Sequence, residues 1–194
     1  MLIAANRPHV QDVPIDTSKP RHPVTAEMTA LTDAKTKKIA PGYQTEDFEG
    51  KPVTIAPPDG RRPQFVYFVL DGCPCSFDAE PLFHRLHKRY KGKIDFVSVT
   101  DAGREKARDW SVQMLVPYAV VPNPEKNIMR AYEAKSSVYA ALVTKDGRIE
   151  KMWPGYSQGI LKEQNAMMAK LVGERAEPFD ASVAPIEKTT SCNF

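Results

Sequence analysis

Three cysteines are the residues of this chain best suited to carry chemistry. Two of them, Cys73 and Cys75, lie in the segment Cys73-Pro74-Cys75-Ser76, and the third, Cys192, lies near the C-terminal end. A small, odd number of cysteines does not suit a framework of structural disulfides. In a reducing compartment, closely spaced cysteines more often carry redox or metal chemistry than form structural disulfides. The segment therefore predicts a reactive thiol site.

The thiol segment stands between a predicted strand and a predicted helix. Residues 64–70 form a nearly continuous apolar and β-branched run, which is typical of a strand buried on both faces. A helix is expected over about residues 77–90. A thiol at a helix N-terminus meets free backbone amides and the positive end of the helix dipole, and both lower its pKa. We predict Cys73 as the catalytic nucleophile and Cys75 as its neighbour or catalytic partner.

The partner that would form a disulfide with Cys73 is left open by the sequence. A disulfide between Cys73 and Cys75 is sterically difficult, because a single proline separates them and the two Cα atoms must adopt a narrow geometry. Such a bond would be strained and easily reduced. Cys192 is the alternative, since it ends a tail long enough to reach many places on a small domain. It is either a resolving cysteine or a bystander thiol.

Metal binding is a rival interpretation of the same thiols. Cys73 and Cys75 are soft ligands that suit Cu(I) or Zn(II). His84 and His87 lie one turn apart on the predicted helix and complete a possible ligand set. Because that helix is amphipathic, we expect both histidines to face water. The sequence therefore predicts no metal and no other cofactor, with this four-residue set as the alternative.

The remaining elements alternate along the chain. Helical spacing or strand-like alternation predicts strands at 94–99, 118–121, 138–143 and 149–153, and helices at 104–114, after Asn123-Pro124, and at 158–172. The turn Lys145-Asp146-Gly147-Arg148 makes the last two strands an antiparallel hairpin. This order predicts an α/β fold, with a mostly parallel central sheet, an antiparallel hairpin at its edge and helices on both faces.

Composition limits the classes of function. The 194 residues are enough for one domain with appended segments, which we place at 1–38 (N-terminal arm), 39–173 (compact domain) and 174–194 (C-terminal tail). The net charge of +3 is spread along the chain, and no apolar run could span a bilayer. We therefore expect no nucleic-acid or membrane partner. The N-terminus lacks the features of a signal peptide, which predicts a cytoplasmic protein.

Four segments resemble redoxin domains, the AhpC/TSA-like group that includes peroxiredoxins and thiol-disulfide oxidoreductases. They are Ile39-Ala40-Pro41, the stretch at 47–53, the stretch at 70–82 centred on Cys73, and Asp146-Gly147-Arg148-Ile149. The resemblance covers about residues 39–172. It implies a thioredoxin-like fold, a thiol site at Cys73, and a thiol reductant as electron donor, such as a small thiol or a thioredoxin-type protein.

The chain departs from these families at three places. Val66 and Leu70 stand where peroxiredoxins have proline and threonine, Gly72 stands where the oxidoreductases have tryptophan, and Ser137-Val138-Tyr139 replaces the usual cis-proline segment. The prediction is a thiol-disulfide oxidoreductase or a peroxiredoxin-like antioxidant enzyme. The alternatives are a Cu(I)/Zn(II) handling module, or a non-catalytic interaction subunit that binds a protein partner through its terminal arms.

Overall fold

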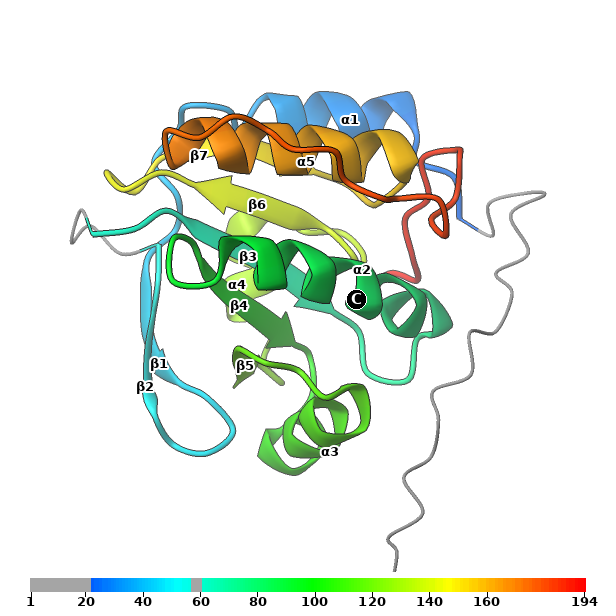
Figure 1. The fold of residues 1–194 in the computed structure, drawn as a ribbon. Helices are drawn as coiled ribbons and strands as arrows, with labels where there is room; N and C mark the ends of the chain where they lie inside the picture. Colours follow the sequence, from blue (N-terminus) through cyan, green and yellow to red (C-terminus); the bar gives the residue numbers. More distant parts are fainter. Residues whose placement is uncertain (1–21, 57–60) are drawn as a thin grey trace, which may run out of the picture.

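A five-stranded sheet organises the computed structural model, which describes residues 22–56 and 61–194 (Figure 1). Its strands have the order β5-β4-β3-β6-β7. Their bounds are β3 (Gln64–Val69), β4 (Asp95–Thr100), β5 (Ala119–Pro122), β6 (Ala140–Val143) and β7 (Ile149–Trp153). β3, β4 and β5 are parallel, whereas β6 is antiparallel to both β3 and β7. The predicted fold class is confirmed, including the antiparallel edge.

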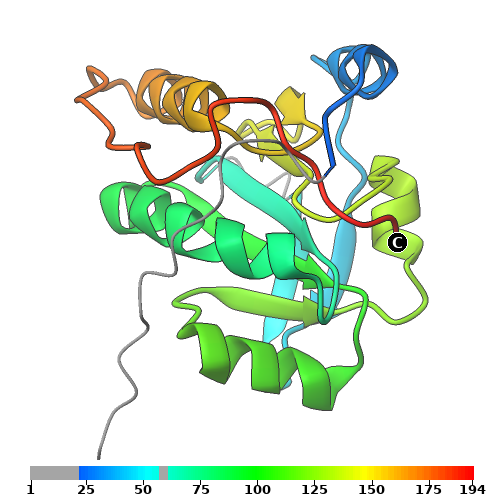
Figure 2. The same ribbon diagram turned by 90° about the vertical axis from the view of Figure 1, so that its right-hand side faces the viewer.

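Helices cover both faces of this sheet (Figure 2). One face carries α2 (Pro74–Tyr90), α3 (Arg104–Met114) and α5 (Gln158–Leu171), whose apolar residues share a core with Phe65 and Leu142. The other face carries α4 (Asn127–Tyr132) and the small antiparallel sheet of β1 (Tyr43–Glu46) and β2 (Pro52–Ile55). Every residue of β3 is buried, as the apolar run predicted. β3 therefore lies in the centre of the domain, and the chain reaches Cys73 shortly after the strand ends.

Three predicted boundaries are wrong. α2 begins at Pro74, earlier than expected, because proline is well suited to the first helical position. α4 begins at Asn127 and not at Asn123; the Asn123 side chain still accepts a hydrogen bond from the Ile128 amide at 3.1 Å. β6 begins at Ala140, because Val138 has a φ of 67° and cannot continue a strand.

The described parts of both terminal segments pack on the domain. α1 (Ala26–Asp33) contacts β7, and Lys151 of that strand lies 3.0 Å from the Asp33 carboxylate. After α5, the chain turns back and residues 174–194 run along α5 and α2 and across the end of the sheet (Figures 1 and 2). The first 21 residues of the predicted N-terminal arm lie outside the described residues. None of the helices in the described segments is long and apolar enough to cross a membrane.

Candidate thiol site

Cys73 lies at the junction between β3 and α2, where the sequence predicted it. Gly72 has a φ of 72°, a conformation that favours glycine and allows the tight turn after β3. Cys73 has an extended backbone and occupies the N-cap position, and Pro74 follows at the first helical position. The carbonyl of Cys73 accepts a hydrogen bond from the Ser76 amide at 3.0 Å. The Cys73 sulfur is thus held at the positive end of a helix of 17 residues.

The segment before β6 forms one wall of the site. The Ser137 hydroxyl lies within hydrogen-bonding distance of the Ser76 hydroxyl and also accepts a hydrogen bond from the Leu70 amide at 3.2 Å. The Val138 amide donates to the Phe68 carbonyl at 2.8 Å. Ser137 was not predicted as a site residue, although the resemblance put its segment in the position of the usual cis-proline segment. These contacts fix the loop that carries Cys73 against the start of β6.

The C-terminal tail forms the other wall. The Ser191 hydroxyl lies 2.7 Å from the Cys73 sulfur, and both residues are buried. The Ser137 amide donates to the Cys192 carbonyl at 3.1 Å, and Ser136 forms an antiparallel bridge with Asn193. The structure therefore brings Cys192 to the site that contains Cys73 and Cys75. All three cysteines are free thiols.

The surroundings of Cys73 favour its thiolate. Burial raises the pKa of Cys73, but hydrogen bonds from the Ser191 hydroxyl, from the amide and thiol of Cys192 and from the Cys75 amide outweigh it, and the pKa lies below its ordinary value. Because the thiolate is the nucleophilic form, Cys73 is better prepared for attack than an ordinary cysteine. Sequence reasoning attributed this effect to the helix alone and did not identify Ser191.

The other two thiols are held in the protonated form. Burial and the negative charge of Cys73 raise the pKa of Cys75 to about 11. The hydrogen bond that the Cys192 thiol gives to Cys73, followed by burial, raises the pKa of Cys192. The lowered pKa of Cys73 and the raised pKa values of Cys75 and Cys192 therefore favour Cys73 as the nucleophile among the three sulfurs. The Cys192 sulfur lies 3.7 Å from Nε2 of His22.

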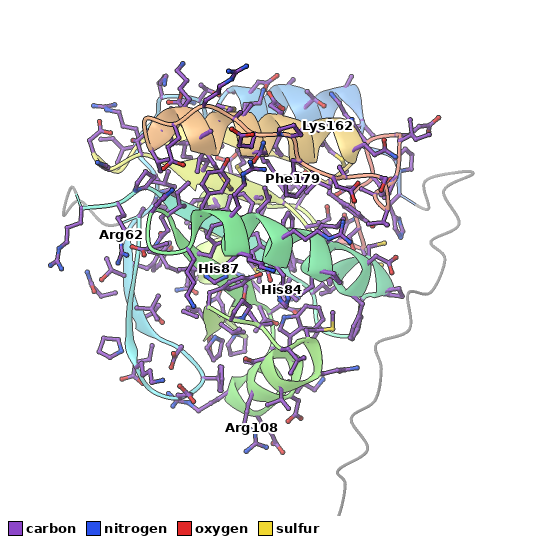
Figure 3. All side chains as sticks on the ribbon, viewed as in Figure 1. Arg62, His84, His87, Arg108, Lys162 and Phe179 are labelled. Carbon is purple, nitrogen blue, oxygen red and sulfur yellow. The ribbon has the colours of Figure 1, made fainter. Side chains whose placement is uncertain are left out.

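The two helix histidines do not join the thiols. The expectation that both face water is wrong for His87, which is buried and packs edge-on against Phe96 and Tyr118, with ring centroids 5.3 and 5.1 Å away (Figure 3). His84 hydrogen-bonds to Glu80 at 3.0 Å. Across residues 22–56 and 61–194, no three His, Cys, Asp or Glu side chains are placed to hold a metal ion. The proposed ligand set of Cys73, Cys75, His84 and His87 is not assembled.

Glu80 is a buried acid that sequence reasoning missed. Its side chain has no exposed surface and accepts hydrogen bonds from the hydroxyls of Tyr118, at 2.7 Å, and of Tyr67. Burial, followed by the charge of Glu80, raises the pKa values of both tyrosines well above the ordinary value, so both remain donors. The available signal was its spacing, because Glu80 lies three residues before Phe83 and thus on the buried side of α2. This cluster anchors the helix that carries the thiols.

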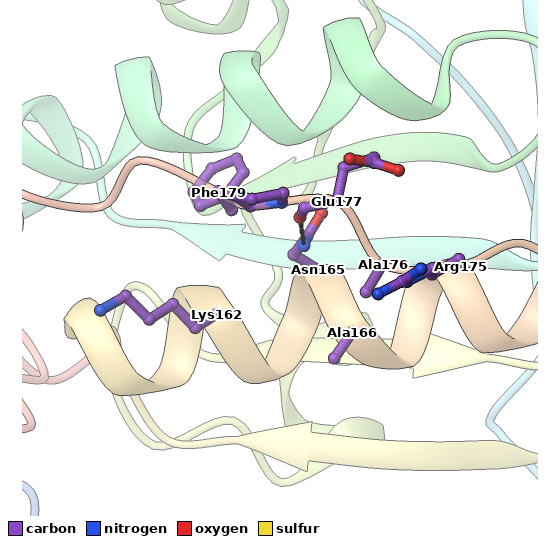
Figure 4. A pocket seen from close by; sticks show the side chains of 8 residues that line it. Lys162, Asn165, Ala166, Arg175, Ala176, Glu177 and Phe179 are labelled. Atoms are coloured by element: carbon purple, nitrogen blue, oxygen red, sulfur yellow. Dashed lines mark hydrogen bonds between the residues drawn. The ribbon is translucent and has the colours of Figure 1, made fainter.

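A surface cavity of about 650 Å³ lies away from the thiols. Its walls are Lys162, Asn165 and Ala166 of α5 and the segment at 175–179 (Figure 4). The Asn165 amide donates to the Glu177 carbonyl at 3.0 Å, which fastens the start of the tail to α5. None of the predicted site residues lines this cavity, so it is separate from the thiol site.

Comparison with known proteins supports the fold. No family model and no curated protein matches the chain. A structure assigned as the thiol:disulfide interchange protein DsbE from Chlorobium tepidum has a TM-score of 0.64 at 18% identity, over 71% of this chain and 98% of that one. A secreted disulfide oxidoreductase from Mycobacterium tuberculosis gives a TM-score of 0.57 at 14% identity, over 76% and 100% of the two chains.

An uncharacterised conserved protein from Geobacillus kaustophilus is also similar, with a TM-score of 0.64 at 15% identity over 82% of this chain and 92% of its own. At such low identities these likenesses concern the fold. The class of the chain is therefore a thioredoxin-like α/β domain. Membership of the redoxin family in particular stays a prediction.

Proposed function

We propose that this protein is a thiol-disulfide oxidoreductase in which Cys73 is the nucleophile and Cys192 is the resolving cysteine. The observations that carry the proposal are the 2.7 Å contact between the Ser191 hydroxyl and the Cys73 sulfur, and the main-chain hydrogen bond from Ser137 that holds the next residue, Cys192, at the same site. These contacts stabilise the thiolate and place a second thiol at the site. The likeness of the fold to proteins described as disulfide oxidoreductases is consistent with this chemistry.

The reaction would proceed in two exchanges. The Cys73 thiolate attacks one sulfur of a substrate disulfide; a mixed disulfide forms and the other substrate sulfur leaves as a thiolate. Cys192 then loses its proton, and its thiolate attacks the Cys73 sulfur and releases the remaining substrate sulfur. The substrate gains two electrons, and the protein ends with a Cys73–Cys192 disulfide. A thiol reductant, either a small thiol or a thioredoxin-type donor, would restore the reduced protein.

Cys75 is the less suitable resolving partner. Pro74 lies between the two cysteines and restricts the approach of their sulfurs. The role of Cys75 in this proposal is structural, as a buried residue of the first turn of α2.

Reduction of peroxides is a second candidate, favoured by the hydroxyl of Ser191 beside the Cys73 sulfur. In that reaction Cys73 would attack the peroxide O–O bond, become a sulfenic acid and release water or an alcohol. The Cys192 thiol would then condense with the sulfenic acid, releasing water and giving the same disulfide. Ser191 would take the place of the hydroxyl that peroxiredoxins draw from threonine and that Leu70 cannot supply.

The experiment is stopped-flow reaction of the reduced protein with a chromogenic pyridyl disulfide, with hydrogen peroxide in a parallel assay. The wild-type protein should release two equivalents of chromophore, one for each exchange. The Cys192→Ser variant should release only one rapidly, Cys75→Ser should retain both, and Cys73→Ser should lose the fast phase. A fast phase that survives in Cys73→Ser contradicts the proposal.

A further inference from the structure

The last six residues of the chain form a strap over the thiol site. We define the C-terminal strap as residues 189–194; it crosses the end of the sheet from the side of α5 to the side of α4 (Figure 2). Thr189, Thr190 and Ser191 are only 5%, 2% and 3% exposed. Beneath the strap, Cys73 and Cys75 are 3% and 4% exposed. The thiol that the electrostatics activate is therefore closed off from solvent.

Backbone hydrogen bonds hold the strap at several points. Thr189 and Tyr156 exchange a pair of amide-to-carbonyl bonds at 2.8 and 2.9 Å, and the Thr190 amide donates to the His22 carbonyl at 2.8 Å. Further along, the Phe194 amide donates to the Lys135 carbonyl at 3.2 Å. The strap is thus held by isolated β-bridges and single main-chain hydrogen bonds, and not as a strand of the sheet.

The strap buries little apolar surface of its own. Its side chains are mainly small and polar, and Cys192 and Phe194 are only partly buried. The preceding turn is exposed, and the Ile186 side chain is 74% exposed. Segments with few buried apolar contacts open at a lower free energy than the core. The free energy of lifting the strap is therefore expected to be lower than that of unfolding the domain.

Gly155 lies where the main chain of the strap approaches the domain very closely. A Cβ atom at this position would lie 2.1 Å from the Thr189 carbonyl oxygen and 2.8 Å from its carbon. Both atoms belong to the main chain, so the strap would have to shift. Gly159 provides a matched comparison, because a Cβ there would meet only the Ser157 hydroxyl at an ordinary 3.8 Å.

We propose that the C-terminal strap is a displaceable cover that determines which disulfides reach Cys73. A small disulfide needs only a local displacement of Ser191, whereas a disulfide carried by a folded protein needs the whole strap to leave its seat on Gly155 and Tyr156. The strap therefore favours small substrates in the closed state and admits protein substrates in the open state. This inference rests on the proposed role of Cys73 as the nucleophile.

The test compares two alkylating reagents on the full-length reduced protein: iodoacetamide, and a maleimide attached to a long polyethylene glycol chain. The rate of modification at Cys73 is followed by peptide mass spectrometry for each reagent. The ratio of the large-reagent rate to the small-reagent rate isolates access, because the thiolate fraction cancels. Gly155→Ala should raise this ratio by about tenfold or more, since reaction through an open state follows its population, and Gly159→Ala should leave it unchanged.

A second variant guards against misfolding of the first. Thr189→Pro removes the amide that donates to the Tyr156 carbonyl, and it should raise the same ratio. If the ratio is unchanged in both variants while Cys73 still reacts with iodoacetamide, the proposal that the strap controls access to Cys73 is wrong. A Cys73 that reacts with neither reagent in any variant instead overturns the proposed nucleophile, and with it the cover.

Discussion

The Ser191 hydroxyl lies 2.7 Å from the Cys73 sulfur, although 118 positions separate the two residues in the chain. The contact exists because the tail after α5 returns across α2 to the end of the sheet. The Cys73 sulfur is thereby reached by hydrogen-bond donors from two elements, the first turn of α2 and the C-terminal tail. We therefore regard the last residues of the chain as part of the thiol site.

Ser191→Ala should shift the pH dependence of Cys73 reactivity to higher pH. The serine hydroxyl helps to hold the pKa of Cys73 below its ordinary value, so its loss lowers the thiolate fraction near neutral pH. The measurement is the rate of iodoacetamide modification of Cys73 between acid and alkaline pH. Ser182→Ala is the control, because Ser182 is exposed and its hydroxyl bonds to Asp180 at 2.6 Å, away from the thiols. Identical midpoints in the wild type and Ser191→Ala would refute the role of Ser191.

Cys75 should resist modification at neutral pH even in protein whose strap has been loosened. Its pKa of about 11 has two main causes, burial and the Cys73 charge, and only the first weakens when the strap opens. Time-resolved mass spectrometry of Gly155→Ala should show Cys73 modified well before Cys75. Adding Cys73→Ser should then make Cys75 more reactive, because the opposing charge is gone. Equal rates at both cysteines in Gly155→Ala would show that the charge of Cys73 has no such effect.

Glu80→Ala should destabilise the domain by about 3 kcal/mol, because the hydroxyls of Tyr67 and Tyr118 would lose their buried acceptor. Urea unfolding measures the change as a lower midpoint. Glu105→Ala, an exposed change on α3, should stay within about 0.5 kcal/mol of the wild type. A midpoint for Glu80→Ala equal to that of Glu105→Ala would show that the cluster contributes nothing to stability.

Leu115→Gly should stabilise the protein by about 0.5–1 kcal/mol. Leu115 ends α3 with a φ of 53°, a left-handed conformation that glycine adopts without strain, and its side chain is 74% exposed. Arg108→Gly, in the middle of the same helix, should instead destabilise by about 0.5–1 kcal/mol. Thermal unfolding of the two variants should move in opposite directions, and a shared direction would refute the explanation.

The local sequence pattern was sufficient to predict the fold class and the position of Cys73 between a strand and a helix. The apolar run of β3, the helical stripe of α2 and the glycine turn before β7 are each encoded by neighbouring residues, so their types and order could be predicted. The boundaries at Val138 and Asn123 depend on single-residue conformations and side-chain bonds, which periodicity does not report.

The partners of Cys73 could be predicted only in part. The length of the tail did not decide whether Cys192 is a partner or a bystander. No local pattern marked Ser191 in the tail, or Ser137 before β6, as a site residue. Their contacts form through the path of the chain across the domain. The burial of His87 could not be predicted for the same reason. It depends on Phe96, which lies on β4, and on Tyr118, which directly precedes β5.

Disulfide mapping is the most direct test of the central claim that Cys73 and Cys192 act as a pair. The reduced protein is oxidised with one equivalent of a small disulfide, its free thiols are alkylated, and its peptides are identified by mass spectrometry before and after reduction. We predict a linked peptide pair that contains Cys73 and Cys192, with Cys75 alkylated only after unfolding. A Cys73–Cys75 disulfide as the main product, with Cys192 free, would contradict the account.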